Sequence, residues 1–256
     1  MKIKVLGSGT SHGVPVIGCG CRVCRSEDPR DARTRASILV EWGQARLLVD
    51  AGPEFRLQAL RAGIDRLDAV LITHAHADHI HGMDDLRPLC TGTALPVLGN
   101  GTAIGEFVAR FDYVFRPTQK GGGKPQFAPR VVEGPFEAGG RPVVPVPVKH
   151  GGLDILGYRM GDFAYLTDTS AIPEASFPLL AGVRHLMIDG LRFKPHPTHF
   201  SIDQAVDAAR RIGASRTWIT HICHDATHAE LEEYLRAKSR PGAEVAAAWD
   251  GLEIEA

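Results

Sequence analysis

The sequence predicts an α/β fold in which two α/β halves form one domain over residues 1–256. Short apolar runs rich in Val, Ile and Leu recur between turn residues, which favours buried strands. Amphipathic segments between some of these runs indicate helices. The chain exceeds the roughly 150 residues of an average domain, but α/β folds of this length often form one unit. The runs are KIKVLGS, ASILVEW, ARLLVDAG, DAVLITHAHADH, RPVVPVPVKHG, FAYLTDTS, HLMIDG and RTWITHICHD.

Two helices can be placed between these runs from the residues at their ends. A helix over 53–62 is expected to have Pro53 in its first turn, where proline is tolerated. The segment SIDQAVDAARRIGA predicts a second helix. There Ser201 and Gln204 form a capping box, and Gly213 ends the helical pattern.

The least regular part of the chain is 116–142, which reads RPTQKGGGKPQFAPRVVEGPFEAGGRP. Its density of Gly and Pro predicts a loop or flap. Strand patterns resume on both sides, so this stretch is not expected to be a linker between domains. A second loop, rich in cysteine, is expected at about 10–25.

The composition is that of an ordinary globular protein, with 44% hydrophobic and 23% charged residues and a formal net charge of -1. Nucleic-acid binders usually carry a global positive field, so a nucleic-acid partner is not expected. No apolar run approaches the ~18 residues that span a membrane, and the first residues lack the apolar segment of a secretory signal. The five cysteines are bunched, which favours a reducing cytoplasm over a disulfide framework.

Side chains of the types that bind metals stand directly after six of the apolar runs. In layered sheets, functional sites gather on the loops beyond strand ends, because the sheet fixes the base of each loop. Six strands that deliver His or Asp in the same way predict one shared site. The residues are Asp50, His74 with His76, His150, Asp168, Asp189 and His221.

The densest signal is THAHADHIHG, in which His74, His76, Asp78 and His79 fall within six positions after a buried run. Imidazole and carboxylate bind zinc, manganese or iron where water must also bind. A tight loop that leads into a helix can direct the first two histidines at one ion, and Asp78 and His79 at a second. A solvated polar turn is the alternative, and the clustering after a strand disfavours it.

HAHADH matches the HxHxDH signature, and the chain is on this ground similar to the metallo-β-lactamase superfamily. The resemblance covers nearly the whole chain and implies an αββα four-layer sandwich with two metal ions at one edge. It implies that His150 in VKHG completes the first metal's ligands and that Asp168 in LTDT bridges both metals. His221 in THICHD would then be the last ligand of the second metal.

A separate cluster, GCGCRVC, places Cys19, Cys21 and Cys24 within six positions, and His224 follows three residues after His221. Three thiolates and one imidazole make a closed tetrahedral set that suits a structural zinc. Disulfide or redox use is the competing interpretation, since Cys21 and Cys24 form a CxxC, but a third thiol weakens it. The cluster resembles the structural zinc site of the PhnP-like phosphodiesterase branch.

Two residues are candidates for the chemistry itself. Asp78 would bind a metal and orient the attacking hydroxide. His199 in KPHPTHFS stands just before a helix N-terminus, a favourable place for an anion. The resemblance implies that a histidine at this place contacts the phosphate and assists catalysis, and a capping or packing role is the alternative. Asp50 is expected to orient a ligand histidine, whereas Asp189 could do so or form a turn.

Other residues are weaker candidates. His12 in the cysteine-rich loop could face the pocket, and Arg116 could bind a phosphate. The prolines beside His196 suggest a fixed surface turn, and His228 is expected at the surface.

The resemblance implies a dinuclear phosphodiesterase that uses a hydroxide shared by two divalent metal ions, zinc or manganese, besides the structural zinc. Its substrate would be a small, cyclic sugar phosphate or nucleotide; in PhnP-like enzymes this is 5-phosphoribosyl 1,2-cyclic phosphate. Family members are often dimers, so a homodimer is an open expectation.

Other functions are less well supported by the residues. A PqqB-like accessory factor in cofactor biosynthesis would be favoured by a degraded ligand set, but here the set is complete. A ribonuclease Z-like nuclease needs a long basic arm for tRNA, whereas 116–142 is short and the chain is not basic. A nucleic-acid module built on the cysteine cluster is disfavoured on the same ground of charge.

Overall fold

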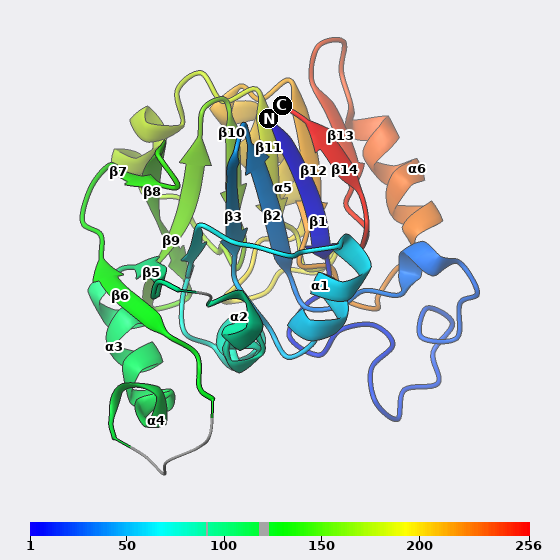
Figure 1. Ribbon diagram of the computed structural model, residues 1–256. Coiled ribbons are helices and arrows are strands. Elements are labelled where there is room, and N and C mark those ends of the chain that lie inside the picture. The colour runs from blue at the N-terminus through cyan, green and yellow to red at the C-terminus, as the bar shows by residue number, and fades with distance from the viewer. Residues whose placement is uncertain (91, 118–122) are drawn as a thin grey trace.

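Two seven-stranded β-sheets lie face to face in the computed structural model, which describes residues 1–90, 92–117 and 123–256 (Figure 1). The first sheet has the strand order β14 (Glu253–Glu255), β1 (Lys2–Gly7), β2 (Ser37–Trp42), β3 (Ala45–Val49), β4 (Ala69–Leu71), β5 (Leu95–Gly99) and β6 (Phe127–Val131). The second has the order β13 (Glu244–Ala247), β12 (Arg216–Thr220), β11 (His185–Asp189), β10 (Phe163–Leu166), β9 (Leu153–Met160), β8 (Arg141–His150) and β7 (Phe136–Ala138). Each half of the chain therefore builds one sheet, and only β14 returns to the first.

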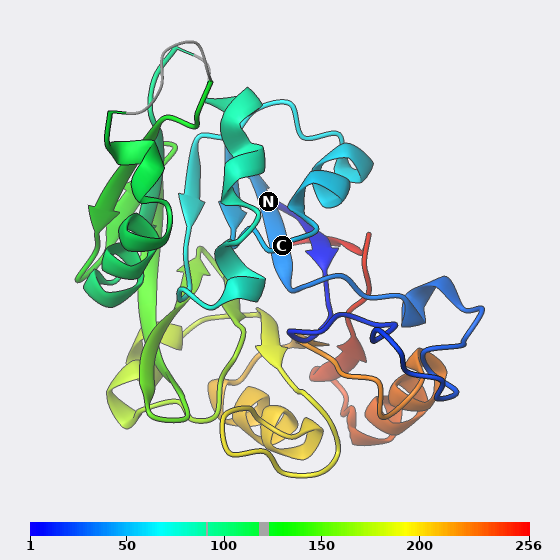
Figure 2. The same cartoon turned by 90° about the horizontal axis from the view of Figure 1, so that it is seen from below.

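Helices cover the outer face of each sheet and complete four layers (Figures 1 and 2). On the first sheet lie α1 (Phe55–Ala62), α2 (Ala77–Ile80), α3 (Gly101–Arg110), α4 (Asp112–Phe115) and the 3₁₀ helix Met83–Leu89. On the second lie α5 (Ile202–Ile212), α6 (His228–Lys238) and the 3₁₀ helix Glu174–Leu180, and a further 3₁₀ turn spans Pro29–Asp31. The predicted αββα sandwich is confirmed. No helix in the described ranges is both long and apolar enough to cross a membrane.

The central strands are buried on both faces, which explains their continuous apolar runs. On β3, Leu47 and Val49 pack into the core between the sheets, and Leu48 packs against the helices outside. This follows the two-residue period of a strand. A hydrogen bond also crosses the inner core, where the hydroxyl of Tyr158 on β9 donates to the carbonyl of Ile72 at 2.6 Å. The two sheets are therefore held in a fixed relation beside the edge where β4 ends.

Parallel pairing brings many strand ends to the same edge. Strands β3 to β6 run parallel to one another in the first sheet, and β10 to β13 do so in the second. Their carboxyl ends therefore meet at one side of the sandwich. The connections that leave this side carry the residues described below.

The predicted helix ends are partly correct. The helix α5 has the expected capping box of Ser201 and Gln204, and Gly213 ends it in the left-handed conformation at φ 83°. The predicted start of the other helix is wrong, because α1 begins at Phe55 and Pro53 precedes it. The amide of Phe55 donates to the carbonyl of Gly52 at 2.9 Å, so a turn occupies the first predicted positions.

The prediction of a loop over 116–142 is only partly correct, because strands interrupt it. The strands β6 and β7 and the start of β8 lie within it. Both β6 and β7 are the last strands of their sheets, and proline and glycine are tolerated on such edges. Residues 118–122 of this stretch lie outside the described residues.

Candidate metal centre

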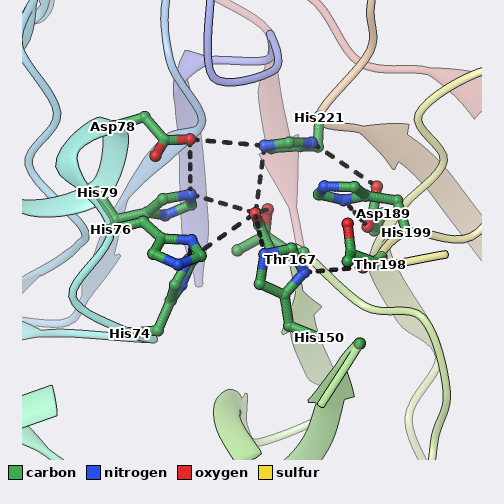
Figure 3. A network of polar contacts seen from close by, with 12 residues as sticks. His74, His76, Asp78, His79, His150, Thr167, Asp189, Thr198, His199 and His221 are labelled. Carbon is green, nitrogen blue, oxygen red and sulfur yellow. Dashed lines mark hydrogen bonds and ion pairs between the residues drawn. The ribbon is translucent and has the colours of Figure 1, made fainter. Parts of the chain in front are cut away.

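Polar side chains from both sheets gather at the edge where the strands end (Figure 3). The structure brings together the residues that follow the apolar runs in the sequence. Asp50 follows β3, His74 and His76 follow β4, His150 ends β8, Asp168 follows β10, Asp189 ends β11 and His221 follows β12.

Three of these residues have an unusual backbone conformation. Asp50, Asp168 and His221 have φ angles of 61°, 51° and 60°, and they are the non-glycine residues with positive φ in the described ranges. The left-handed region costs a side-chain-bearing residue roughly 1–2 kcal/mol, and such residues cluster at functional sites. The chain therefore turns sharply after β3, β10 and β12, where it delivers a polar side chain each time.

A first cluster consists of His74, His76 and His150, with one ring nitrogen of each within 4.8 Å of the others. Nε2 of His74 lies 2.9 Å from Nδ1 of His76. Nδ1 of His150 donates to the carbonyl oxygen of Thr198 at 2.7 Å, which leaves the Nε2 lone pair for the cluster. Three neutral imidazoles are a common ligand set for zinc.

A second cluster consists of Asp78, His79, Asp168 and His221. Nε2 of His79 lies 3.2 Å from Oδ2 of Asp78 and 3.2 Å from Oδ1 of Asp168. Nε2 of His221 lies 3.3 Å from the same Oδ1. Tetrahedral ligands at 2.0–2.1 Å from zinc are about 3.3 Å apart, so the spacing fits one ion. The two Nε2 atoms are buried without a hydrogen-bond partner among the described residues, which is the state expected of metal ligands.

The carboxylate of Asp168 lies between the two clusters. Its Oδ2 is 3.8 Å from Nε2 of His74 and 3.8 Å from Nε2 of His150, in the first cluster. Its Oδ1 faces the imidazoles of His79 and His221 in the second. One carboxylate therefore presents an oxygen to each cluster.

Asp50 holds one candidate ligand in place. Its buried carboxylate accepts hydrogen bonds from the amide and the hydroxyl of Thr73, each at 2.8 Å. It also accepts one from Nδ1 of His79 at 2.7 Å. Because this bond places the proton of His79 on Nδ1, its Nε2 lone pair points into the second cluster. Thr73 was not among the predicted residues, although its position directly before the first histidine of the motif could have indicated it.

His199 and Asp189 form a second supported pair. Nδ1 of His199 donates to Oδ2 of Asp189 at 2.8 Å, and the amide of Thr169 donates to the same oxygen at 2.7 Å. The ring of His199 lies 4.7 Å from that of His221 and 4.8 Å from that of His150. Burial and the neighbouring His221 lower the pKa of His199 to about 4. Asp189 therefore orients a histidine, one of the two roles that the sequence left open.

The second cluster contains two carboxylates, Asp78 and Asp168, whose charge a cation would balance. Burial opposes charge on Asp168, but His221 and His79 outweigh it and hold the pKa of Asp168 well below its ordinary value. Burial likewise opposes charge on His221, yet Asp168 and Asp78 raise its pKa to about 9. The carboxylates thus draw protons onto neighbouring imidazoles, and a divalent cation would replace those protons.

The cysteine cluster closes around His224. The Sγ atoms of Cys19, Cys21 and Cys24 lie 3.5, 3.5 and 3.4 Å from its Nδ1. Tetrahedral zinc with Zn–S of 2.3 Å and Zn–N of 2.0 Å separates S from N by about 3.5 Å, so the four side chains fit zinc. The backbone amide of Cys24 donates to Sγ of Cys21 at 3.4 Å and lowers the pKa of that thiol to about 6, which favours the thiolate.

His196 lies half-buried in a turn between the exposed Pro195 and Pro197, as the sequence predicts. Nδ1 of His196 accepts a hydrogen bond from the amide of Thr198 at 3.3 Å, and its ring lies 5.2 Å from that of His199. His196 is therefore part of the segment that carries His199. The prediction that His228 is at the surface is wrong: this first residue of α6 is 1% exposed, and its Nδ1 faces the buried Arg33 at 3.2 Å.

Two other candidates do not join the clusters. His12 is exposed in the N-terminal loop. Arg116 forms an exposed ion pair with Asp112 at 3.2 Å, on the last turn of α4. The carbonyl of Thr198, which fixes His150, was missed because a backbone acceptor leaves no signal in the side-chain sequence.

The chain is similar in sequence and in structure to several known proteins. The family described as the beta-lactamase superfamily domain matches residues 45–222. A solved diphosphatase from the PhnP family is 42% identical over 100% of this chain and 97% of its own, with a TM-score of 0.91. Zinc-bound PqqB from Methylobacterium extorquens, at 19% identity, TM-score 0.78 and full coverage of both chains, shares the fold.

Among curated proteins, an octanoyltransferase from Porphyromonas gingivalis (strain ATCC BAA-308 / W83) is 43% identical over 265 residues. The match covers 99% of this chain but 51% of that protein. The chain therefore spans about half the length of this curated relative.

Proposed function

Since the chain belongs to the metallo-β-lactamase superfamily, in its PhnP-like branch, we propose that it is a metal-dependent hydrolase that cleaves a small phosphodiester. The observation that supports this most directly is the placement of Asp168 between the two ligand clusters. His74, His76 and His150 would hold one divalent ion and Asp78, His79 and His221 the other, with Asp168 shared. Divalent cations there, when bound, polarise phosphoryl oxygens and lower the pKa of water.

The remaining groups of the site suit a phosphoryl reaction. Asp78 lies at the start of α2 with its carboxylate directed at the second cluster, where it can also accept a hydrogen bond from the attacking water. His199 presents its Nε2 side to the site, because its Nδ1 is engaged with Asp189. This nitrogen can contact the oxygen that leaves phosphorus, and the hydrogen bond to Asp189 at 2.8 Å fixes the orientation of the ring.

Hydrolysis of a diphosphate is a second candidate. It is favoured by the 42% identity to the solved PhnP-family diphosphatase over the whole chain. Both reactions would use the chemistry that divalent cations supply to a phosphoryl group, and both need a proton for the leaving oxygen, so the same residues would serve either. Octanoyl transfer is not proposed, because this chain corresponds to only 51% of the protein with that name.

The proposal is tested with metal-loaded protein on bis(p-nitrophenyl) phosphate and on inorganic and nucleoside diphosphates, with Zn²⁺ and Mn²⁺ supplied separately. The substitution His76→Ala should lower kcat/KM by about 100-fold or more, since it removes one ligand. His185→Ala is the matched control, because His185 stacks on Trp218 away from both clusters. Equal rates for the unsubstituted protein and His76→Ala would remove this site from consideration, and hydrolysis of diphosphates alone would favour the second candidate.

A further inference from the structure

A cavity of about 190 Å³ opens beside His74 and His76. It lies on the side of the site away from His199, because the ring of His150 stands between them, 5.2 Å from His76 and 4.8 Å from His199 (Figure 3). Its wall comes from the segment after β4, the start of α3 and the turn between β8 and β9. At roughly 30 Å³ per water molecule the cavity has room for about six waters, or for one ring with its substituents.

Small and apolar residues form the floor of the cavity. Ala75 and Ala103 are 4% and 3% exposed, and Ile155 is 2% exposed. Asn100 fixes one wall, since its Oδ1 accepts from the amide of Ala103 at 2.8 Å and its Nδ2 donates to the carbonyl of Asp154 at 3.1 Å. These hydrogen bonds connect the start of α3 to the start of β9, so the backbone of the fold fixes the shape of the cavity.

The polar part of the wall offers oxygen acceptors and no cation. Thr102, Glu106 and Asp154 line it, and the lining drawn from the described residues contains no lysine or arginine. Arg110 and Lys149 pair with Glu106 at 2.8 Å and with Asp154 at 2.6 Å without lining the cavity themselves. Hydroxyl groups can donate to these acceptors, whereas a phosphate would meet two carboxylates, each already paired with one cation, and no lysine or arginine in the lining.

A phosphodiester has two substituents on one phosphoryl group. With that group at the metal centre, one substituent lies toward His199 and the other toward this cavity. We propose that the cavity is the subsite for the second substituent and takes a neutral ring that carries hydroxyl groups, such as a ribosyl or glycosyl group. The inference rests on the proposed function and narrows it: a ring with a further phosphate, as in 5-phosphoribosyl 1,2-cyclic phosphate, is disfavoured.

The first test compares two esters that release the same p-nitrophenolate, methyl p-nitrophenyl phosphate and thymidine 5′-(p-nitrophenyl phosphate). Thr102→Trp fills the cavity from an exposed position of α3. It should lower kcat/KM for the thymidine ester about tenfold and leave that for the methyl ester within about twofold, since only the former loses ring contacts. Thr93→Trp is the matched control. Thr93 is exposed just before the start of β5, whereas the cavity lies beyond the end of β5, so kcat/KM should not change for either ester.

The second test concerns charge and uses substitutions that preserve shape at exposed positions. The double variant Glu106→Gln, Asp154→Asn should raise kcat/KM for the 3′-phosphorylated thymidine ester about tenfold relative to the plain ester, because it replaces two carboxylates of the phosphate's own sign by neutral amides. The subsite proposal would be refuted if Thr102→Trp lowered kcat/KM equally for both esters. It would also be refuted if the double variant left the ratio of kcat/KM between the phosphorylated and the plain thymidine ester unchanged. If the unsubstituted, metal-loaded protein hydrolyses neither ester, the proposed function itself fails.

Discussion

The substitution Asp50→Asn separates metal binding from the later steps at this site. The carboxylate accepts three hydrogen bonds, two from Thr73 and one from Nδ1 of His79. The amide of asparagine has nearly the same shape, but it keeps only one acceptor oxygen and has an NH₂ group in place of the other. If the oxygen stays with the Thr73 amide, the NH₂ group faces Nδ1 of His79. His79 then accepts there and carries its proton on Nε2, the atom that should bind the ion.

The expected loss can be set from this geometry. A hydrogen bond to a charged group contributes about 1.5–3 kcal/mol, and each 1.4 kcal/mol is a factor of ten in affinity. Loss of the bond between Asp50 and His79 should therefore weaken binding at the second cluster about 10- to 100-fold, the range typical for partners that orient a metal ligand. Binding at the first cluster should change less, because its histidines reach Asp50 only through the hydroxyl of Thr73, which lies 3.1 Å from Nδ1 of His74.

The assay is competition for Zn²⁺ or Mn²⁺ against a chromogenic chelator, with ions per chain counted at saturation. Asp189→Asn is the comparator, since Asp189 is also a buried carboxylate at a strand end but hydrogen-bonds His199. It should leave metal affinity within about threefold and lower kcat by about 100-fold, the range of a lost proton donor. Unchanged affinity in Asp50→Asn, or identical behaviour of the two variants, would refute the assignment of roles.

Three further results are expected. Cys21→Ser should remove about one zinc ion per chain, which elemental analysis would measure. It should also lower Tm in thermal melting by roughly 2–4 °C for each kcal/mol of stability lost. Tyr158→Phe should cost about 1–2 kcal/mol in urea unfolding, because it breaks the hydrogen bond that crosses the inner core. Burial, and next the charge of Arg33, lower the pKa of His228 to about 4. Below its ordinary value of 6.5 only the unfolded chain takes up that proton, so stability should fall from about pH 6.5 toward pH 4, and less in His228→Gln.

Each of these three predictions has a control. Cys90→Ser should retain all bound zinc, because Cys90 is remote from the cysteine cluster. Tyr234→Phe loses an exposed hydrogen bond to Asp203 and should cost less than Tyr158→Phe. A pH profile that stays unchanged in His228→Gln would show that His228 does not cause the slope.

The fold and the clusters could be predicted because both depend on local signals. Buried strands need apolar runs, and polar side chains after such runs are rare without a role, so Asp168 and His221 are visible in the sequence. Asp189 could not be assigned, because its role depends on His199, which the α5 capping region brings back toward β11. Such pairing arises from tertiary structure.

The errors have a shared cause as well. Edge strands tolerate proline, so Pro129 in β6 hides a strand that pairs with β5 on one side only. His228 caused the opposite error. It opens an ordinary amphipathic helix, and only the approach of Arg33 and of the backbone near Asp31 buries it. Neither edge position nor long-range burial is encoded within a short window of residues.

The left-handed backbone conformation of Asp50, Asp168 and His221 lowers the stability of the fold, whereas their side chains serve the candidate metal centre. Glycine adopts that conformation without the roughly 1–2 kcal/mol that a side chain costs, so a glycine at any of the three positions would relieve the backbone. At these three positions the chain therefore keeps a strained backbone in exchange for a polar side chain directed at the candidate metal centre.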